Sequence, residues 1–315
     1  MSDTIEKMVI VGTGPAGLTA AIYGARSGLS PTVYAGIQPG GQLTTTTEVE
    51  NFPGFSQGIL GPKLMEEMTE QAKRVGSKII NEAVTSVETV NSPSGAVKKL
   101  WTSDGGSILA HTVILCTGAT AKTLGLDRET ELMGHGVSTC ATCDGFFYRK
   151  KHVVVVGGGD SAMEEALFLA NLAEKVVLIH RRALFRASHI MLERAKKHPN
   201  IEMMVPYTVC KLLEKDGALI GVTTQHSESQ EQRDLPIDGL FYAIGHTPNS
   251  QIFRPWVDTD DQGYVIVHDY VKTKTSGVFV AGDLCDPHFR QAITAAGLGC
   301  RAAMTAIRYL DERNL

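Results

Sequence analysis

The sequence predicts an α/β protein made of two parallel-sheet domains. Three observations support this fold class. A pattern of buried strand, glycine turn, helix and second strand occurs at residues 7–35 and again at residues 151–180. A further buried strand, at residues 277–283, ends in a Gly-Asp turn before a long helical stretch. The chain has 315 residues, a length more typical of two domains than of one.

The bulk composition excludes several classes of protein. Hydrophobic residues make up 43% of the chain and charged residues 20%, as in ordinary globular proteins. The formal net charge of −4 argues against a general nucleic-acid binder. We find no signal-peptide pattern before the first strand, and no apolar run approaches the roughly 20 residues that span a bilayer. We therefore expect a cytoplasmic protein whose partners include neither nucleic acid nor membrane.

Each copy of the repeat has small residues where a dinucleotide-binding turn needs them. The first glycine permits the tight turn, the second lets the backbone approach a pyrophosphate, and the third small residue lets the helix pack on the strand. The helix N-terminus then offers free N–H groups to the phosphates. Two such turns predict two Rossmann-like domains that bind a flavin and a nicotinamide. The aligned positions are Gly12 with Gly157, Gly14 with Gly159, and Gly17 with Ala162.

Basic residues follow the second strand of the second copy. That strand ends in His180-Arg181-Arg182, and Arg186 stands four residues further on. At this position an acid favours NAD, whereas basic residues accept the 2′-phosphate of NADP. A guanidinium gives a phosphate two parallel charged hydrogen bonds. The segment predicts an NADPH site, and the alternative is a solvated basic surface.

The first copy is then expected to bind FAD, although it lacks one expected residue. Its second strand ends without an acid for a ribose hydroxyl, and the loop Gly40-Gly41-Gln42-Leu43 is expected to supply backbone contacts instead. Asp283, which follows Gly282, can accept hydrogen bonds from flavin ribityl hydroxyls; the alternative is an ordinary cap. A helix beginning around Arg290, Gln291 and Ala292 can stabilise negative charge on a reduced flavin ring.

Cys140-Ala141-Thr142-Cys143 is the close pair among six cysteines. Two thiols at this spacing can close and reopen a disulfide. A zinc site would need a second pair of ligands, which the scattered cysteines do not offer, so we expect no bound metal. Two unreactive structural cysteines are the other alternative. Asp144 follows directly and can hold and release the proton that exchange requires, or it can simply cap the turn before Gly145.

These motifs together resemble those of the low-molecular-weight thioredoxin reductases, over nearly the whole chain. The most specific strings are Cys140-Ala141-Thr142-Cys143-Asp144 and Gly40-Gly41-Gln42-Leu43-Thr44-Thr45-Thr46-Thr47. The other matching segments are Gly12-Thr13-Gly14-Pro15-Ala16-Gly17, Glu50-Asn51-Phe52-Pro53-Gly54, Thr117-Gly118-Ala119, Gly157-Gly158-Gly159-Asp160-Ser161-Ala162, His180-Arg181-Arg182 with Arg186, Ala243-Ile244-Gly245-His246-Thr247-Pro248-Asn249, Gly282-Asp283 and Arg290-Gln291-Ala292.

The resemblance implies a domain organisation and a reaction. FAD would be bound by residues 1–119 and 250–315, and an NADPH domain at residues 120–249 would be inserted between them and carry the Cys pair. Electrons would pass from NADPH through FAD to a Cys140–Cys143 disulfide, with Cys143 against the flavin and Asp144 managing protons, and then to the disulfide of thioredoxin. The resemblance also implies a homodimer.

The resemblance and the motifs name a full set of cofactor-binding residues. For FAD they are Gly12, Gly14, Pro15, Ala16, Gly40, Gly41, Gln42, Leu43, Asn51, Thr117, Gly118, Gly282, Asp283, Arg290, Gln291 and Ala292. For NADPH they are Gly157, Gly159, Asp160, Ser161, His180, Arg181, Arg182 and Arg186.

Two other functions compete with this interpretation. The flavoprotein subunit of alkyl hydroperoxide reductase shares the core but adds an N-terminal thioredoxin-like extension, whereas here the first glycine turn begins at residue 12. A non-catalytic redox sensor that binds NADPH is the alternative from a different class. Turnover of NADPH with a disulfide acceptor distinguishes an enzyme from a sensor.

Overall fold

A computed structural model describes residues 5–92 and 95–315, and the chain forms two compact units. One unit contains the residues up to Thr120 together with Thr247–Leu315, and the other is Ala121–His246. The second unit is therefore inserted in the sequence of the first. The boundaries expected from the sequence, after residues 119 and 249, lie one and three residues from these. Which cofactor each unit binds stays a prediction.

The first unit is built on a mostly parallel sheet centred on β1 (Ile5–Val11) and β8 (Ser107–Leu115). The strand order is β5-β2-β1-β8-β7-β6, and β19 also pairs with β8. Strands β6 and β7 are antiparallel to their neighbours, whereas the other pairs are parallel. The remaining strands are β2 (Thr32–Tyr34), β5 (Lys78–Ile80), β6 (Val84–Ser92), β7 (Gly95–Thr102) and β19 (Val278–Val280).

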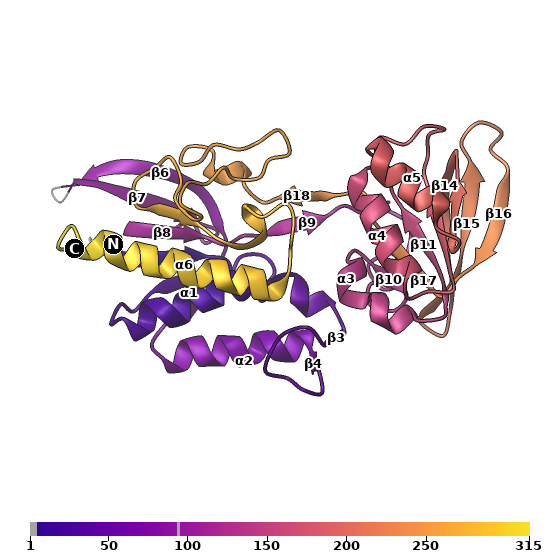
Figure 1. The fold of residues 1–315 in the computed structure, drawn as a ribbon. Coiled ribbons are helices and arrows are strands. Elements are labelled where there is room, and N and C mark those ends of the chain that lie inside the picture. Colours follow the sequence, from indigo (N-terminus) through magenta and orange to yellow (C-terminus); the bar gives the residue numbers. More distant parts are fainter. Residues whose placement is uncertain (1–4, 93–94) are drawn as a thin grey trace. The chain divides into compact units, whose positions relative to one another are not determined.

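Helices α1 (Pro15–Arg26) and α6 (Ala292–Asp311) lie side by side against this sheet, next to α2 (Gly61–Arg74) (Figure 1). Pro15 begins α1, since its fixed φ suits a first helical turn. Gln291 is the N-cap of α6 and forms a capping box with Thr294, so the helix begins at the end of the segment where the sequence placed it. The small side chains of both helices let them approach the sheet closely.

The second unit contains a fully parallel sheet in the order β10-β17-β11-β12-β13. Its strands are valine-rich because both faces are covered. Helices α4 (Asp160–Ala170) and α5 (His189–Lys197) pack on one face, and the antiparallel sheet β14-β15-β16 packs on the other. The strands are β10 (Val137–Ser138), β11 (His152–Val156), β12 (Lys175–Ile179), β13 (Ile201–Met204), β14 (Tyr207–Lys215), β15 (Ala218–His226), β16 (Gln232–Pro236) and β17 (Gly239–Tyr242).

Short elements complete the fold. The strands β9 (Ala119–Ala121) and β18 (His246–Pro248) pair where the chain passes between the units. Strands β3 (Glu48–Val49) and β4 (Ile59–Leu60) pair as well, and α3 (Ala141–Asp144) follows β10. No helix in the described ranges has the length and apolar character needed to cross a bilayer.

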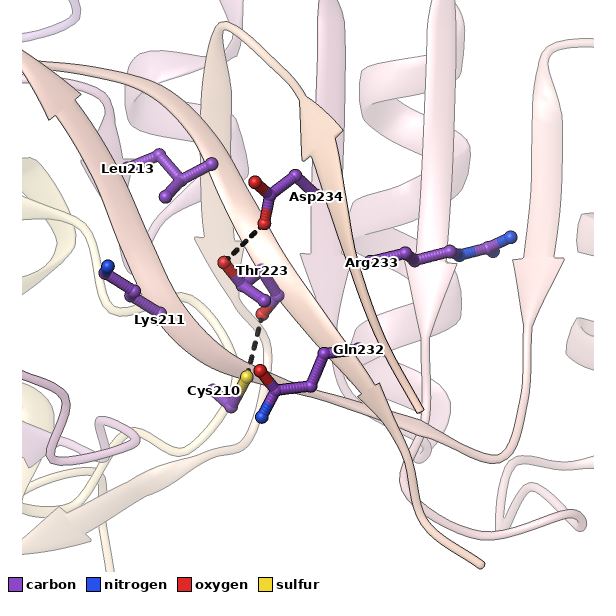
Figure 2. A pocket seen from close by; sticks show the side chains of 7 residues that line it. All are labelled: Cys210, Lys211, Leu213, Thr223, Gln232, Arg233 and Asp234. Carbon is purple, nitrogen blue, oxygen red and sulfur yellow. Dashed lines mark hydrogen bonds between the residues drawn. The ribbon is translucent and has the colours of Figure 1, made fainter. Parts of the chain in front are cut away.

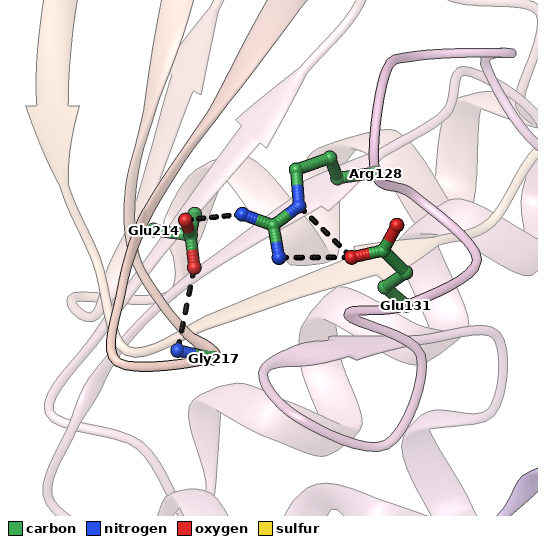
Figure 3. Close-up of polar contacts among 4 residues, drawn as sticks. All are labelled: Arg128, Glu131, Glu214 and Gly217. Carbon is green, nitrogen blue, oxygen red and sulfur yellow. Dashed lines mark hydrogen bonds and ion pairs between the residues drawn. The ribbon is translucent and has the colours of Figure 1, made fainter.

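An exposed charge cluster fixes the loop that leads into β10. The guanidinium of Arg128 binds the Glu131 carboxylate at 2.8 Å and also the Glu214 carboxylate on β14 (Figure 3). Glu214 in turn accepts the N–H of Gly217 at 3.3 Å. Exposed ion pairs contribute little individually, but this cluster joins the loop to the end of β14, which is far away in the sequence.

Candidate functional site

The first glycine turn closes against the ends of three strands. Gly12, with a φ of 111°, donates its N–H to the Tyr34 carbonyl at 2.8 Å. A Cβ on Gly12 would overlap the Cys116 carbonyl, and a Cβ on Gly17 would overlap the Gly12 carbonyl. Both glycines are therefore required by the packing of the protein itself.

Gly14 has a different reason to be a glycine. Its φ is −67°, which any residue adopts, and an added Cβ would meet no atom within 4 Å. The position is the N-cap of α1, where the first helical N–H groups lack intrahelical partners. Open space beside these donors fits the close approach of a pyrophosphate.

The second turn repeats this division of roles. Gly157 donates its N–H to the Ile179 carbonyl at 3.0 Å, and a Cβ there would overlap the Ala243 carbonyl. Gly159, the N-cap of α4, has a φ of −101° and open space where its Cβ would lie. Because the same geometry recurs in both units, the residues at both turns fit a dinucleotide.

The three arginines after β12 are exposed in the loop before α5. The ion pairs that arginines form within the described residues involve Arg128 and Arg313, not Arg181, Arg182 or Arg186. Three cations that are not neutralised by a carboxylate fit a doubly charged 2′-phosphate better than they fit a structural ion-pair network.

His180 lies beneath the second turn rather than beside the arginines on the surface. Its side chain is 7% exposed, stacks on Phe185 with ring centroids 5.2 Å apart, and occupies the space where Gly158 would carry a Cβ. Burial lowers the pKa of His180. Its Nε2 is buried without a hydrogen-bond partner in the described chain, and a direct contact with NADPH stays a prediction.

The residues expected to bind FAD come together in the first unit. Gly41 lies against Gly14, since a Cβ added to Gly41 would lie 3.5 Å from the Gly14 Cα. Ala16 faces Gly282. Gln42 donates to the Ala119 carbonyl, next to Thr117 and Gly118. The side chains of Asn51 and Gln291 are joined by a 3.3 Å hydrogen bond. These contacts link the first turn, the Gly40–Leu43 loop, the segment at Thr117 and the start of α6 into one region.

Asp283 supplies the strongest test of whether this region fits a flavin. Its Oδ1 is buried with no hydrogen-bond partner among the described residues. Burial, with a smaller contribution from the charge of Asp286, raises the pKa of the Asp283 carboxyl to about 6. A buried acceptor without a donor is costly, and a ligand hydroxyl at this point would satisfy it. The residues present therefore fit the expected group.

Cys140 and Cys143 form a disulfide at the start of the short helix α3, with their Cα atoms 5.3 Å apart. Cys140 is the N-cap, and its sulfur accepts the Cys143 N–H at 3.2 Å. Cys143 is exposed and Cys140 is partly buried. The remaining four cysteines are free thiols, of which Cys116 is buried and Cys210, Cys285 and Cys300 are partly buried.

Asp144 lies next to the disulfide and contacts Ser138, a residue that the sequence did not single out. The Ser138 hydroxyl donates to the Asp144 carboxylate at 2.6 Å. The Oγ of Ser138 also accepts the Cys140 N–H at 3.0 Å. Burial raises the pKa of Asp144, and the Ser138 hydrogen bond opposes that shift. This environment suits a carboxyl that exchanges protons with the neighbouring sulfurs.

Thr13 is a second residue that sequence reasoning missed. Its hydroxyl donates to the Ala35 carbonyl at 3.3 Å and accepts the Gly40 N–H at 2.9 Å, which anchors the Gly40–Leu43 loop to the first turn. Its position between two motif glycines was a usable signal, whereas Ser138 offered only its closeness to the Cys pair.

A hollow on the β14-β15-β16 sheet contains none of the predicted residues (Figure 2). Cys210 lies there at a β-bulge, and its thiol donates to the Thr223 carbonyl at 3.3 Å, while the Thr223 hydroxyl donates to Asp234. Burial raises the pKa of Cys210, which disfavours a reactive thiolate. No group of three or more potential metal ligands occurs within the residues that the structure describes.

Comparisons with known proteins show the family of the chain. The chain matches the family described as pyridine nucleotide-disulphide oxidoreductase over residues 6–299. It is 49% identical over 314 residues to a thioredoxin reductase of Mycolicibacterium smegmatis, covering 99% of both chains. It is also 47% identical to a bifunctional thioredoxin reductase/thioredoxin of Mycobacterium leprae, covering 98% of this chain and 67% of that one.

Solved structures give the same result. The thioredoxin reductase of Streptococcus pyogenes superimposes with a TM-score of 0.92 at 35% identity, covering 99% of this chain and 100% of the other. That of Giardia duodenalis gives a TM-score of 0.89 at 38% identity, covering 97% and 98%. The chain has two dinucleotide-type turns and a disulfide between the closely spaced Cys140 and Cys143. It belongs to the thioredoxin reductases, within the pyridine nucleotide-disulphide oxidoreductase family.

Proposed function

We propose that the chain is an NADPH-dependent thioredoxin-disulfide reductase that carries FAD and acts through the Cys140–Cys143 disulfide. The observation that carries this proposal is the disulfide itself, which lies next to the partly buried carboxyl of Asp144, in the same unit as three arginines that form no ion pair among the described residues. Membership of the family supports the use of a flavin and a pyridine nucleotide. The assignment to FAD and NADPH rests on the two turns and the arginines.

The bound cofactors would supply the hydride transfer, which no side chain can perform. The chain's own residues do the rest. The turns at Gly14 and Gly159 would hold the pyrophosphates, Arg181, Arg182 and Arg186 the 2′-phosphate, and Asp283 the ribityl chain. Asp144 would donate a proton to the departing sulfur when the disulfide opens and would accept one when the dithiol is reoxidised.

The dithiol then reduces its partner by exchange. A thiolate of the Cys140–Cys143 pair attacks the thioredoxin disulfide, which gives a mixed disulfide and one released thiol. The second thiol of the pair displaces thioredoxin and re-forms the Cys140–Cys143 bond. The exposure of Cys143 and Thr142 supports access for a protein substrate. Two electrons and two protons reach thioredoxin in each cycle.

We also propose the homodimer that the resemblance implies, with α6 at its interface. Ile293 and Met304 are 45% and 44% exposed, and Gly297 and Cys300 lie between them at helical spacing. Positions four, three and four residues apart form one stripe along a helix, and an exposed apolar stripe favours helix packing with a second copy. Sedimentation velocity measures this state, and a monomer at micromolar concentration contradicts the proposal. The cytoplasmic location stays a prediction.

The decisive experiment measures NADPH oxidation by the purified yellow protein, with and without a panel of oxidised thioredoxins. We expect steady turnover only when a thioredoxin disulfide is present. Cys143→Ser should still let NADPH bleach the flavin but should abolish thioredoxin reduction. Normal thioredoxin turnover by this variant would show that the pair is structural. Flavin reduction without turnover of any disulfide in the wild type would favour the redox sensor.

A further inference from the structure

Three hydrogen bonds fasten the arginine loop to the second glycine turn. Asp160, the first residue of α4, accepts the Ser188 N–H on its Oδ1 at 2.7 Å, across 28 residues of sequence. The carbonyl of Gly158 accepts the N–H groups of Arg186 and Ala187, at 2.7 and 3.1 Å. Only the bond from Asp160 uses a side chain, so it alone depends on the residue type.

The fastened segment belongs to the loop between β12, which ends at Ile179, and α5, which begins at His189. The loop has further anchors near its start. The His180 N–H donates to the Met204 carbonyl at 3.2 Å, and the His180 carbonyl accepts the Tyr207 N–H at 3.0 Å. The Ser227 hydroxyl donates to the Arg181 carbonyl at 2.9 Å, and the His180 ring packs against Gly158. Long arginine side chains lose much conformational freedom when they bind a phosphate. If the loop is already held in place, the backbone that carries the arginines loses less conformational freedom when the phosphate binds.

Asp160 itself is poorly suited to contact a phosphate. Its carboxylate can accept hydrogen bonds but has none to donate, and its charge would repel phosphates at the start of α4. Its carboxylate is instead used within the chain, on Ser188.

We infer that Asp160 is a positioning residue that decides the affinity for the 2′-phosphate without touching it, by joining the pyrophosphate turn to the arginine loop. The inference rests on the proposed NADPH site and adds the residue that couples its two halves. Charge and geometry predict opposite outcomes here. If Asp160 acted only through its charge, removing it would strengthen the binding of a phosphate, whereas removal of a positioning bond weakens it.

The test is calorimetric titration of the flavin-loaded protein with 2′,5′-ADP, which carries the 2′-phosphate without the nicotinamide. We expect Asp160→Ala to weaken binding about 5- to 10-fold, which is within the range of one ordinary hydrogen bond. Asp160→Asn keeps the Oδ1 acceptor and should bind within about twofold of the wild type or more tightly. Glu164→Ala, which removes an exposed acid one turn further along α4, serves as the matched control and should not weaken binding.

Amide hydrogen exchange at Ser188 measures the bond directly and should accelerate in Asp160→Ala but not in Glu164→Ala. Binding of 2′,5′-ADP by Asp160→Ala that equals or exceeds that of the wild type overturns the inference, as does unchanged exchange at Ser188. A wild-type protein that does not bind 2′,5′-ADP instead overturns the proposed NADPH site, so the two failures are distinguishable.

Discussion

Replacing Asp283 by Asn should stabilise the flavin-free protein and lower the affinity of the protein for flavin. The carboxyl has a pKa of about 6 against an ordinary value of 3.8, chiefly because it is buried. A difference of about two units corresponds to about 3 kcal/mol by which ionised Asp283 destabilises the folded state. Asn has nearly the same shape and no charge, so Asp283→Asn removes this penalty.

The sign of the pH dependence follows from the raised pKa. Well below pH 4 the carboxyl is protonated in both the folded and the unfolded chain, and the variant should then match the wild type. As the pH rises from about 4 to 6 the unfolded chain loses its proton first, so the wild type loses stability relative to the variant. Above pH 7 the variant should be more stable by about 1–3 kcal/mol.

Urea unfolding of the flavin-free protein, followed by tryptophan fluorescence between pH 4 and 8, measures this difference. Both tryptophans, Trp101 and Trp256, lie in the first unit, so the signal reports the unit that contains Asp283. A parallel flavin titration should show a weakened affinity in Asp283→Asn, because a neutral amide oxygen is a poorer acceptor than a carboxylate. A variant that is less stable at pH 8, or a stability difference that does not change with pH, would contradict this explanation.

Three further outcomes follow from the site. Gly14→Ala should fold as stably as the wild type yet retain little flavin, because the added Cβ would lie in open space that only the ligand would fill. The absorbance of the bound flavin measures its retention, and a variant that fails to fold would contradict this prediction. Arg181→Ala or Arg182→Ala should lower NADPH efficiency roughly 10- to 150-fold and leave that of NADH nearly unchanged, and equal losses with both cofactors would disprove the clamp. Ser138→Ala removes the hydrogen bond that lowers the pKa of Asp144, so the pH profile of thioredoxin reduction should move to higher pH, and a profile that stays in place would exclude Asp144 as the proton carrier.

The arrangement of the glycine turns was predictable because its causes are local. Gly12 and Gly157 are needed for a tight turn between a strand and a helix, and their spacing to the next small residue follows from helix geometry. The Cys140–Cys143 disulfide is local for the same reason, since both cysteines lie in one turn of chain. The assignment of the arginines to the 2′-phosphate stays a prediction, which rests on the position of the second strand's end in this fold.

Contacts between segments could not be predicted in this way. No sequence pattern places the Ser138 hydroxyl on Asp144, the Asp160 carboxylate on Ser188, or the His180 ring under Gly158. The orphaned Oδ1 of Asp283 is also a property of the packed fold, since the burial that raises its pKa comes from residues distant in sequence.

The two βαβ units, the Cys pair and the sign of the charge expected at the 2′-phosphate follow from the amino-acid sequence alone. Periodicity, turn chemistry and residue charge act over a few residues and can be read from the chain directly. In contrast, the folded structure is needed to show which carboxylates are buried, which are hydrogen-bonded and which loops are held in place. Burial and hydrogen bonding depend on how distant segments pack, and that packing sets the pKa of Asp144 and Asp283 and the anchoring of the arginine loop.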